Sequence, residues 1–266
     1  MGTSSIYNGP KDRNPLLPEG FEDNYNSDNP NQNEDDNQER GEVFPWKVTK
    51  NAMSQFVTGR SSNKGRIPRS YVRALGGARN AAKSAKSGSK AAIRLGQFLS
   101  DVINEGIEAT FRRLNIEYRG KNVESLFSEM VNILSEDSNT KEDIAARNAS
   151  IDALSQLYDF VEENGMDIES LERMDESFFN KVMSSFISNY LIERLLKDLQ
   201  SRLEKYADNI SIAISKEKEV KEYISESVEV KLSDIEFRNI EYRDQNIDTV
   251  IEAIYRECYE ILEEYL

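Results

Sequence analysis

Histidine is absent from this 266-residue sequence, and cysteine occurs only once, at Cys258. Without histidine the chain has no Ser-His or Cys-His nucleophile pair and no imidazole ligand for a metal ion. A single thiol cannot form an intramolecular disulfide or a thiolate zinc site. Catalysis by carboxylates stays open as a third reading, but no spacing singles out a pair among the 48 acidic residues. We therefore predict that the protein is not an enzyme and has no metal and no cofactor.

Long apolar runs are also missing, because no stretch approaches the roughly 20 residues that cross a bilayer. Residues 1–9 have no apolar stretch behind a charged start, so we expect no signal peptide. Ile6 occupies the place where an N-myristoylation pattern requires Ser or Thr. Together with the single cysteine, these features predict a cytoplasmic protein.

Charge divides the sequence into three segments within a net charge of −14. Residues 1–45 hold three basic and ten acidic side chains, residues 46–120 hold fifteen and four, and residues 121–266 hold sixteen and thirty-four. Acidic charge is therefore concentrated at both ends and basic charge in the middle. We predict a disordered N-terminal arm over 1–45, a basic helical segment over 46–120 and an acidic helical domain over 121–266, all-α in class.

The arm combines a polar tract with a few apolar residues near its start. Residues 22–40 are almost entirely Asn, Asp, Glu, Gln and Ser, with Tyr25 as the single large apolar side chain. Such a tract cannot bury enough surface to offset the roughly 1–2 kcal/mol per residue that backbone ordering costs. The apolar residues before it predict either a peptide displayed for a partner or an ordinary irregular terminus; the candidates for partner contact are Ile6, Tyr7, Leu16 and Leu17.

The middle segment contains no Asp or Glu between Glu42 and Asp101. Five of its cations, from Arg79 to Arg94, recur at spacings of three or four residues, so one helix would align them on one face. We define the basic stripe as these five residues together with three preceding arginines: Arg66, Arg69, Arg73, Arg79, Lys83, Lys86, Lys90 and Arg94.

The basic stripe has three readings, which the sequence leaves open. It can neutralise nucleic-acid phosphates, dock on an acidic partner protein, or pack against the acidic helices of its own chain. Few aromatic residues lie among these charges, which disfavours sequence-specific reading of single strands. Trp46, at the start of the segment, is either the first anchor of the core or a docking residue.

Glycines divide the predicted helices of the basic segment. Gly76 and Gly77 lack the Lys-Ser/Thr of a phosphate-binding loop, and predict a bend between basic helices. Gly88 followed by Ser89 predicts a helix break with Ser89 as the next N-cap. From Ile93 to Leu114 the apolar residues follow a helical period, with an interruption expected at Gly106.

Helical patterns continue through the acidic domain. We expect a short helix over 123–134, and a second one that opens at a capping box formed by Thr140 and Asp143 and stops at Gly165. The longest helix is predicted over 176–206, and the last begins at Asp248, with Cys258 buried on its apolar face. Between them, residues 228–232 alternate apolar and charged side chains and predict a short strand or a frayed linker.

Two stretches of the sequence resemble a known family. The opening residues 1–18 (MGTSSIYNGPKDRNPLLP), and the run RSYVRALGGAR over 69–79 that continues to Arg94-Leu95-Gly96, are similar to the QatB family of the bacterial Qat anti-phage defence operon. This resemblance covers the start of the arm and residues 66–114.

The resemblance implies a non-enzymatic member of a four-gene system. Its family partners are an ATPase, a nuclease similar to TatD and a QueC-like enzyme, QatC, whose housekeeping relatives make a deazaguanine nitrile. In defence operons such enzymes are thought to attach the deazaguanine through an amide to an N-terminal glycine, and Gly2 matches that residue here. We therefore expect an antiviral-defence subunit that is modified at Gly2 and acts as a scaffold for partner proteins. A nucleic-acid-binding accessory protein that uses the basic stripe is the alternative.

Overall fold

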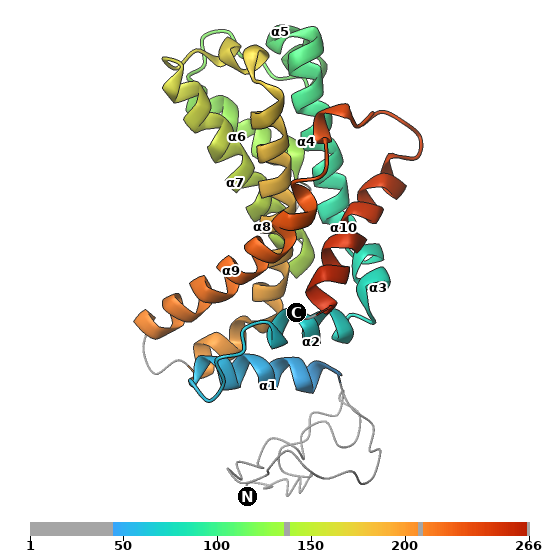
Figure 1. The fold of residues 1–266 in the computed structure, drawn as a ribbon. Helices are drawn as coiled ribbons and strands as arrows, with labels where there is room; N and C mark the ends of the chain where they lie inside the picture. The colour runs from blue at the N-terminus through green and yellow to red at the C-terminus, as the bar shows by residue number, and fades with distance from the viewer. Residues whose placement is uncertain (1–44, 136–138, 207–209, 265–266) are drawn as a thin grey trace, which may run out of the picture. The chain divides into compact units, whose positions relative to one another are not determined.

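The computed structural model describes residues 45–135, 139–206 and 210–264, and within them it contains helices and no strand. The all-α prediction is therefore confirmed. The predicted arm lies outside the described residues except for Pro45, which begins the first helix. Figure 1 shows α8 running through the middle of the other helices, with α1 and α2 at one end and α5 at the other.

Five helices form from the basic segment. They are α1 (Pro45–Val57), α2 (Arg66–Ala74), α3 (Ala78–Lys83), α4 (Lys86–Glu105) and α5 (Ile107–Arg113). Gly76 and Gly77 have φ values of 90° and 88° and produce the predicted bend between α2 and α3. Gly106, with φ of 86°, separates α4 from α5, as the sequence predicted. A positive φ is readily adopted only by glycine, so these residues end the helices before them.

The prediction of a break at Gly88 is wrong, because α4 continues through it. Ser89 is not an N-cap; its hydroxyl donates to the carbonyl of Ala85 at 2.8 Å, inside the helix. A Cβ atom on Gly88 would clash with the Tyr190 ring of α8, and one on Gly96 would clash with the Tyr242 ring. Both glycines therefore allow an aromatic ring to pack directly against the α4 backbone.

The acidic half begins with α6 (Val123–Leu134) and α7 (Lys141–Glu163), followed by the 3-10 helix η1 (Ile168–Arg173). Thr140 and Asp143 form the predicted capping box: Thr140 Oγ1 accepts from the Asp143 N–H at 3.1 Å, and Asp143 Oδ2 accepts from the Thr140 N–H at 2.8 Å. The α7 helix ends just before Gly165, which has φ of 78°. Local sequence therefore determines where this helix starts and stops.

The longest helix, α8 (Glu176–Tyr206), matches the predicted range. Its predicted apolar face is buried, with these members below 6% exposed: Phe179, Val182, Phe186, Ile192, Leu195, Leu199 and Leu203. The helix packs against α7, α9, α1 and α4, and so holds the basic and acidic halves together around one core.

The chain ends with α9 (Ile210–Leu232), the 3-10 helix η2 (Phe237–Asn239) and α10 (Ile247–Glu263). The strand or linker expected over 228–232 is wrong, because these residues complete α9. Val228 and Leu232 are buried while Val230 is 66% exposed, and Val220 and Ile224 continue the same four-residue spacing. A helical period was therefore mistaken for a strand period within a window of five residues. Among the described helices none is long and apolar enough to cross a membrane.

Candidate functional site

The basic stripe lies on three separate helices. Arg66, Arg69 and Arg73 belong to α2, Arg79 and Lys83 to α3, and the remaining three cations to α4. The five cations from Arg79 to Arg94 do not share one helix, because the break lies at Ser84 and Ala85, between α3 and α4. Side chains that share a spacing of three to four residues in the sequence are therefore divided between two helix axes.

Most of the stripe faces solvent. Arg66, Arg73, Arg79, Lys83, Lys86 and Lys90 are exposed, and Arg69 and Arg94 are half-buried. Within the described part of the chain, Arg73, Arg79, Lys83 and Lys86 form no ion pair. These four cations are therefore not neutralised by the described acidic side chains.

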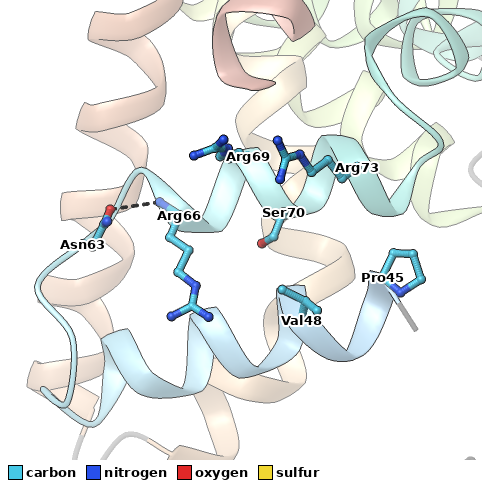
Figure 2. Close-up of a pocket in the computed structure, with 7 residues that line it drawn as sticks. All are labelled: Pro45, Val48, Asn63, Arg66, Arg69, Ser70 and Arg73. Atoms are coloured by element: carbon cyan, nitrogen blue, oxygen red, sulfur yellow. Dashed lines mark hydrogen bonds between the residues drawn. The ribbon is translucent and has the colours of Figure 1, made fainter. Parts of the chain in front are cut away.

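The three α2 arginines line a concave surface between α1 and α2, which we call the arginine groove (Figure 2). Its volume is about 600 Å³. Figure 2 shows Arg66 extending from α2 toward α1. None of the described residues that line this groove is acidic; they are Pro45, Val48, Asn63, Arg66, Arg69, Ser70 and Arg73.

Both walls of the arginine groove are fixed to the core. On α2, Tyr71 is fully buried and its hydroxyl donates to Asp198 Oδ2 of α8 at 2.9 Å. On α1, Phe56 is buried and its ring lies 4.5 Å from the Lys216 ammonium of α9. Asn63 Oδ1 accepts from the Arg66 N–H at 3.1 Å at the start of α2. The arginines therefore project from anchored helices, a condition that favours defined binding geometry.

Trp46 packs on the core as well. It is half-buried, and its ring centroid lies 5.7 Å from that of Tyr71 in an edge-to-face arrangement. Of the two sequence-based interpretations, the structure supports the core anchor.

A second concave surface, of about 250 Å³, contains three other arginines, Arg94, Arg113 and Arg243. It also contains the buried Asp101, which pairs with Arg113 and accepts two hydrogen bonds from Arg243 at 2.8 and 3.1 Å. The Asp101 carboxylate therefore already pairs with two of these three guanidinium groups, those of Arg113 and Arg243. Among the described residues that line the arginine groove none is acidic, which makes it the stronger candidate for an external anion.

Carboxylates from the acidic half bind the first turns of three helices in the basic segment. The N-cap residues of α3, α4 and α5 are Gly77, Ala85 and Gly106, and none caps through its side chain. Instead, Glu263 Oε2 accepts from the Ala78 N–H at 3.0 Å, and Glu172 Oε1 accepts from the Ile107 N–H at 2.7 Å. These carboxylates satisfy unpaired N–H groups and favourably oppose the positive end of each helix dipole.

Glu142 makes the most extensive of these contacts. Its Oε1 accepts from the backbone N–H of Ser87 at 2.8 Å and of Gly88 at 3.1 Å, and from the Tyr190 hydroxyl at 2.7 Å. The Ser87 hydroxyl lies 2.7 Å from Glu142 Oε2 and 2.6 Å from Asp143 Oδ1. These carboxylates of the acidic half therefore bind backbone N–H groups of the basic segment. They do not pair with the exposed side chains of Arg73, Arg79, Lys83 and Lys86.

One arginine of the acidic half is buried against the basic segment. Arg194 of α8 is 8% exposed, and its guanidinium donates to the Ala81 carbonyl at 3.1 Å, the Tyr259 hydroxyl at 2.9 Å and the Ser84 hydroxyl at 2.7 Å. These contacts join α8 and α10 to the short α3–α4 connection. Sequence reasoning missed this residue, since no spacing distinguishes Arg194 from the half-buried charged residues near it.

Cys258 is buried on α10, as predicted. Burial raises the pKa of its thiol to about 12, so the group is protonated at neutral pH. A protonated, enclosed thiol is a poor nucleophile.

Five sequence-predicted residues lie outside the described residues. They are the proposed modification site and the apolar partner-contact residues of the arm: Gly2, Ile6, Tyr7, Leu16 and Leu17. The described ranges contain no group of three or more acidic or cysteine side chains that could hold a metal ion. Sequence reasoning did not identify Pro45 and Val48 as groove residues, because they approach the arginines only when α1 packs on α2. It also missed Asn63 and Ser70, which lie near the arginines in the sequence but follow no pattern that marks a site.

Comparison with known proteins gives one match. The model of a protein family described as "Qat anti-phage system associated protein QatB" matches residues 76–262, which is well over half of the chain. No curated protein and no solved structure matches.

Proposed function

Because this chain belongs to the QatB family and is therefore a component of the Qat anti-phage defence system, we propose that it acts there as a non-enzymatic, cytoplasmic subunit. In this proposal it is the substrate of the QueC-like enzyme QatC, which attaches a deazaguanine to Gly2, and it is a scaffold for the ATPase and the TatD-like nuclease. Family membership is the single observation on which the proposal chiefly depends.

The chemistry of Gly2 supports the substrate role. Removal of Met1 before a small glycine leaves an unhindered amine with a pKa near 7.7–8.0, so a useful fraction is neutral and nucleophilic at cellular pH. Gly2 precedes the first described helix by 43 residues. A tether of that length allows an enzyme to reach the amine while the helices stay folded.

Two observations favour a non-enzymatic subunit. The sequence contains no histidine, and its single thiol is buried with a raised pKa. The carboxylates of Glu142 and Asp101, in addition, are engaged in hydrogen bonds within the fold.

The exposed cations and the arginine groove support the scaffold role. Charged groups on anchored helices can bind partner proteins without rearrangement of the core. The proposal assigns the arm to modification and the helical part of the chain to partner binding.

Mass spectrometry of the intact protein, co-expressed with its operon, tests the proposal. We expect loss of Met1 and gain of a deazaguanine-sized mass on the tryptic peptide that spans residues 2–11. A strain that is protected against phage but carries an unmodified amino terminus would overturn the modification role.

Variants of the arm sharpen that test. Gly2→Ala should reduce modification and phage protection, because a methyl group beside the amine crowds a pocket shaped for glycine. Changing Ile6 and Tyr7 to Ser should weaken modification if these apolar residues dock the arm on the enzyme. Full protection by Gly2→Ala would contradict the proposal.

A nucleic-acid-binding accessory protein is the second candidate, favoured by the four exposed stripe cations that have no described ion pair. The absorbance ratio at 260 and 280 nm of the purified protein, before and after a high-salt wash, tests it. Binding through phosphates should fall linearly on a plot of log affinity against log salt concentration. A purified protein free of nucleic acid at low salt would argue against this candidate.

A further inference from the structure

We propose that the arginine groove between α1 and α2 binds an acidic peptide segment of a partner protein, one with several carboxylates beside an apolar residue. This inference rests on the scaffold part of the proposed function and names the site and the chemistry of its partner.

The lining of the groove defines the charge of its ligand. None of the described residues that line it is acidic, and the guanidinium groups of Arg66 and Arg73 are exposed. Arg66 already donates to Gln55 Oε1 at 3.2 Å, a neutral partner that leaves its charge uncompensated. Guanidinium groups bind carboxylates through paired, charge-assisted hydrogen bonds, so the groove selects an anion.

The dimensions of the groove fit a short peptide. Its volume of about 600 Å³ lies within the range of ordinary ligand sites. Arg66 and Arg73 are seven residues apart on α2, a rise of about 10 Å. Alternate side chains of an extended peptide are about 6.7 Å apart. Two or three carboxylates on such a peptide therefore match the length of the arginine row.

Apolar groups in the same groove favour a peptide over a nucleic acid. Pro45 and Val48 contribute from α1, toward which Arg66 extends from α2 (Figure 2). An apolar side chain next to the carboxylates of a peptide can cover Pro45 and Val48. None of the described lining residues is aromatic, so they offer no surface on which nucleobases could stack.

The charge of the rest of the chain also disfavours a long polyanion. Net charge is −14 overall, and residues 121–266 carry sixteen basic against thirty-four acidic side chains. A long nucleic acid would extend beyond the groove and be repelled by this negative charge, whereas a short acidic peptide would mainly contact the arginines of the groove.

Fluorescence anisotropy of the purified full-length protein tests the proposal. The probe is a fluorescein-labelled twelve-residue peptide with eight glutamates, two leucines and two glycines. Companion probes are the same peptide with glutamine in place of glutamate and a twelve-nucleotide oligothymidylate. We expect the glutamate peptide to bind, the glutamine peptide to bind at least tenfold more weakly, and added salt to reduce binding.

Two double variants with the same change in charge locate the binding surface. Arg66→Glu with Arg73→Glu, inside the groove, should weaken peptide binding at least tenfold. Arg79→Glu with Lys83→Glu, exposed on α3 and outside the groove, should change it by less than about twofold at physiological salt, where the screening length is about 8 Å. If the first variant fails to fold, Arg66→Gln with Arg73→Gln provides the same comparison.

Three outcomes would overturn the inference. They are an absence of binding by the glutamate peptide, equal losses in the two double variants, and tighter binding of oligothymidylate that the groove substitutions abolish. The last outcome would assign the groove to nucleic acid. None of them affects the mass measured on Gly2, so failure of this inference is distinguishable from failure of the modification role.

Discussion

Two helices of the acidic half begin differently from three helices of the basic segment. The acidic helices α6 and α7 are capped by their own sequence, through Asn122 and the capping box of Thr140 and Asp143. In contrast, α3, α4 and α5 receive carboxylates from Glu263, Glu142 and Glu172, all in the acidic half. Three of the five helices of the basic segment therefore depend on the acidic half for their starts, while most of the segment's cations stay exposed.

This difference separates two roles of charge in one fold. Carboxylates at helix N-termini stabilise the backbone, at typically 0.3–1 kcal/mol for each favourable dipole contact. Exposed cations without partners contribute little to stability. We infer that the acidic half stabilises the basic segment and that the cations serve binding.

The largest expected effect comes from disrupting the packing of α4 against its aromatic neighbours. Gly88→Ala and Gly96→Ala place a methyl group against the rings of Tyr190 and Tyr242. Overpacking of this kind costs about 1–3 kcal/mol. Each variant should lower the thermal midpoint in a circular-dichroism melt. An unchanged or raised midpoint, which is normal when a helical glycine outside such a contact becomes alanine, would contradict the packing described here.

Removal of the Glu142 carboxylate should have the next largest effect. Glu142→Gln keeps an acceptor oxygen but removes the charge from the contacts with the Ser87 and Gly88 N–H groups and with the Tyr190 hydroxyl. It should therefore cost only part of the about 1.5–3 kcal/mol that hydrogen bonds to charged groups contribute. Glu172→Gln and Glu263→Gln should each cost less, about 0.5–1 kcal/mol, since each of these carboxylates accepts one backbone N–H.

Urea denaturation measures the free energy of unfolding for this series. Glu162→Gln, on an exposed part of α7, is the matched control and should change stability by less than about 0.5 kcal/mol. Equal effects at Glu142 and Glu162 would contradict the capping role.

Acid should weaken the junction of α4 and α7. The Ser87 hydroxyl, followed by the Thr140 contacts of the capping box, lowers the pKa of the Asp143 carboxyl. A carboxyl with a lowered pKa in the folded state stabilises the fold fully above its unfolded pKa, near 3.9, and loses that contribution as pH falls through the folded pKa. Melts between pH 7 and pH 3 should therefore show a smaller acid-induced loss for Asp143→Asn than for the wild-type protein.

Ser87→Ala should reduce the same acid-induced loss, because it removes the largest cause of the lowered pKa. An acid response of both variants identical to that of the wild-type protein would contradict this assignment.

The smallest effect on stability is expected from the exposed cations. Reversal of Lys83, Lys86 and Lys90 to Glu should leave the helical signal unchanged and shift stability by no more than about 0.5 kcal/mol per site, as is usual for surface substitutions. A cooperative loss of several kcal/mol would instead show that the acidic half neutralises these side chains.

Local patterns in the sequence predicted most of the helices. The 31-residue α8, the capping box of α7 and the glycine interruptions at Gly76, Gly77 and Gly106 follow from periodicity and backbone chemistry alone. Gly88 was assigned wrongly because its role depends on Tyr190, about one hundred residues later in the chain. The α9 error arose because five residues cannot distinguish a period of two from a period of four.

Prediction of the site was limited in the same way. Composition identified the basic stripe, and α2 places Arg66, Arg69 and Arg73 in one groove. Sequence alone could not show that α3 and α4 are separate helices, or that Glu142, Glu172 and Glu263 cap the basic segment. Such contacts join residues tens to hundreds of positions apart, and no local pattern encodes them.

The central claim is that the exposed cations of the basic segment serve binding rather than stability. The efficiency of phage plating on cells that carry the complete Qat operon tests it most directly. Cells with Arg66→Glu and Arg73→Glu in this subunit are compared with wild-type cells at matched protein levels, verified by immunoblot. The account predicts at least a tenfold loss of protection while the melting temperature of the purified variant stays within a few degrees of the wild-type value. Full protection by a folded groove variant would contradict it.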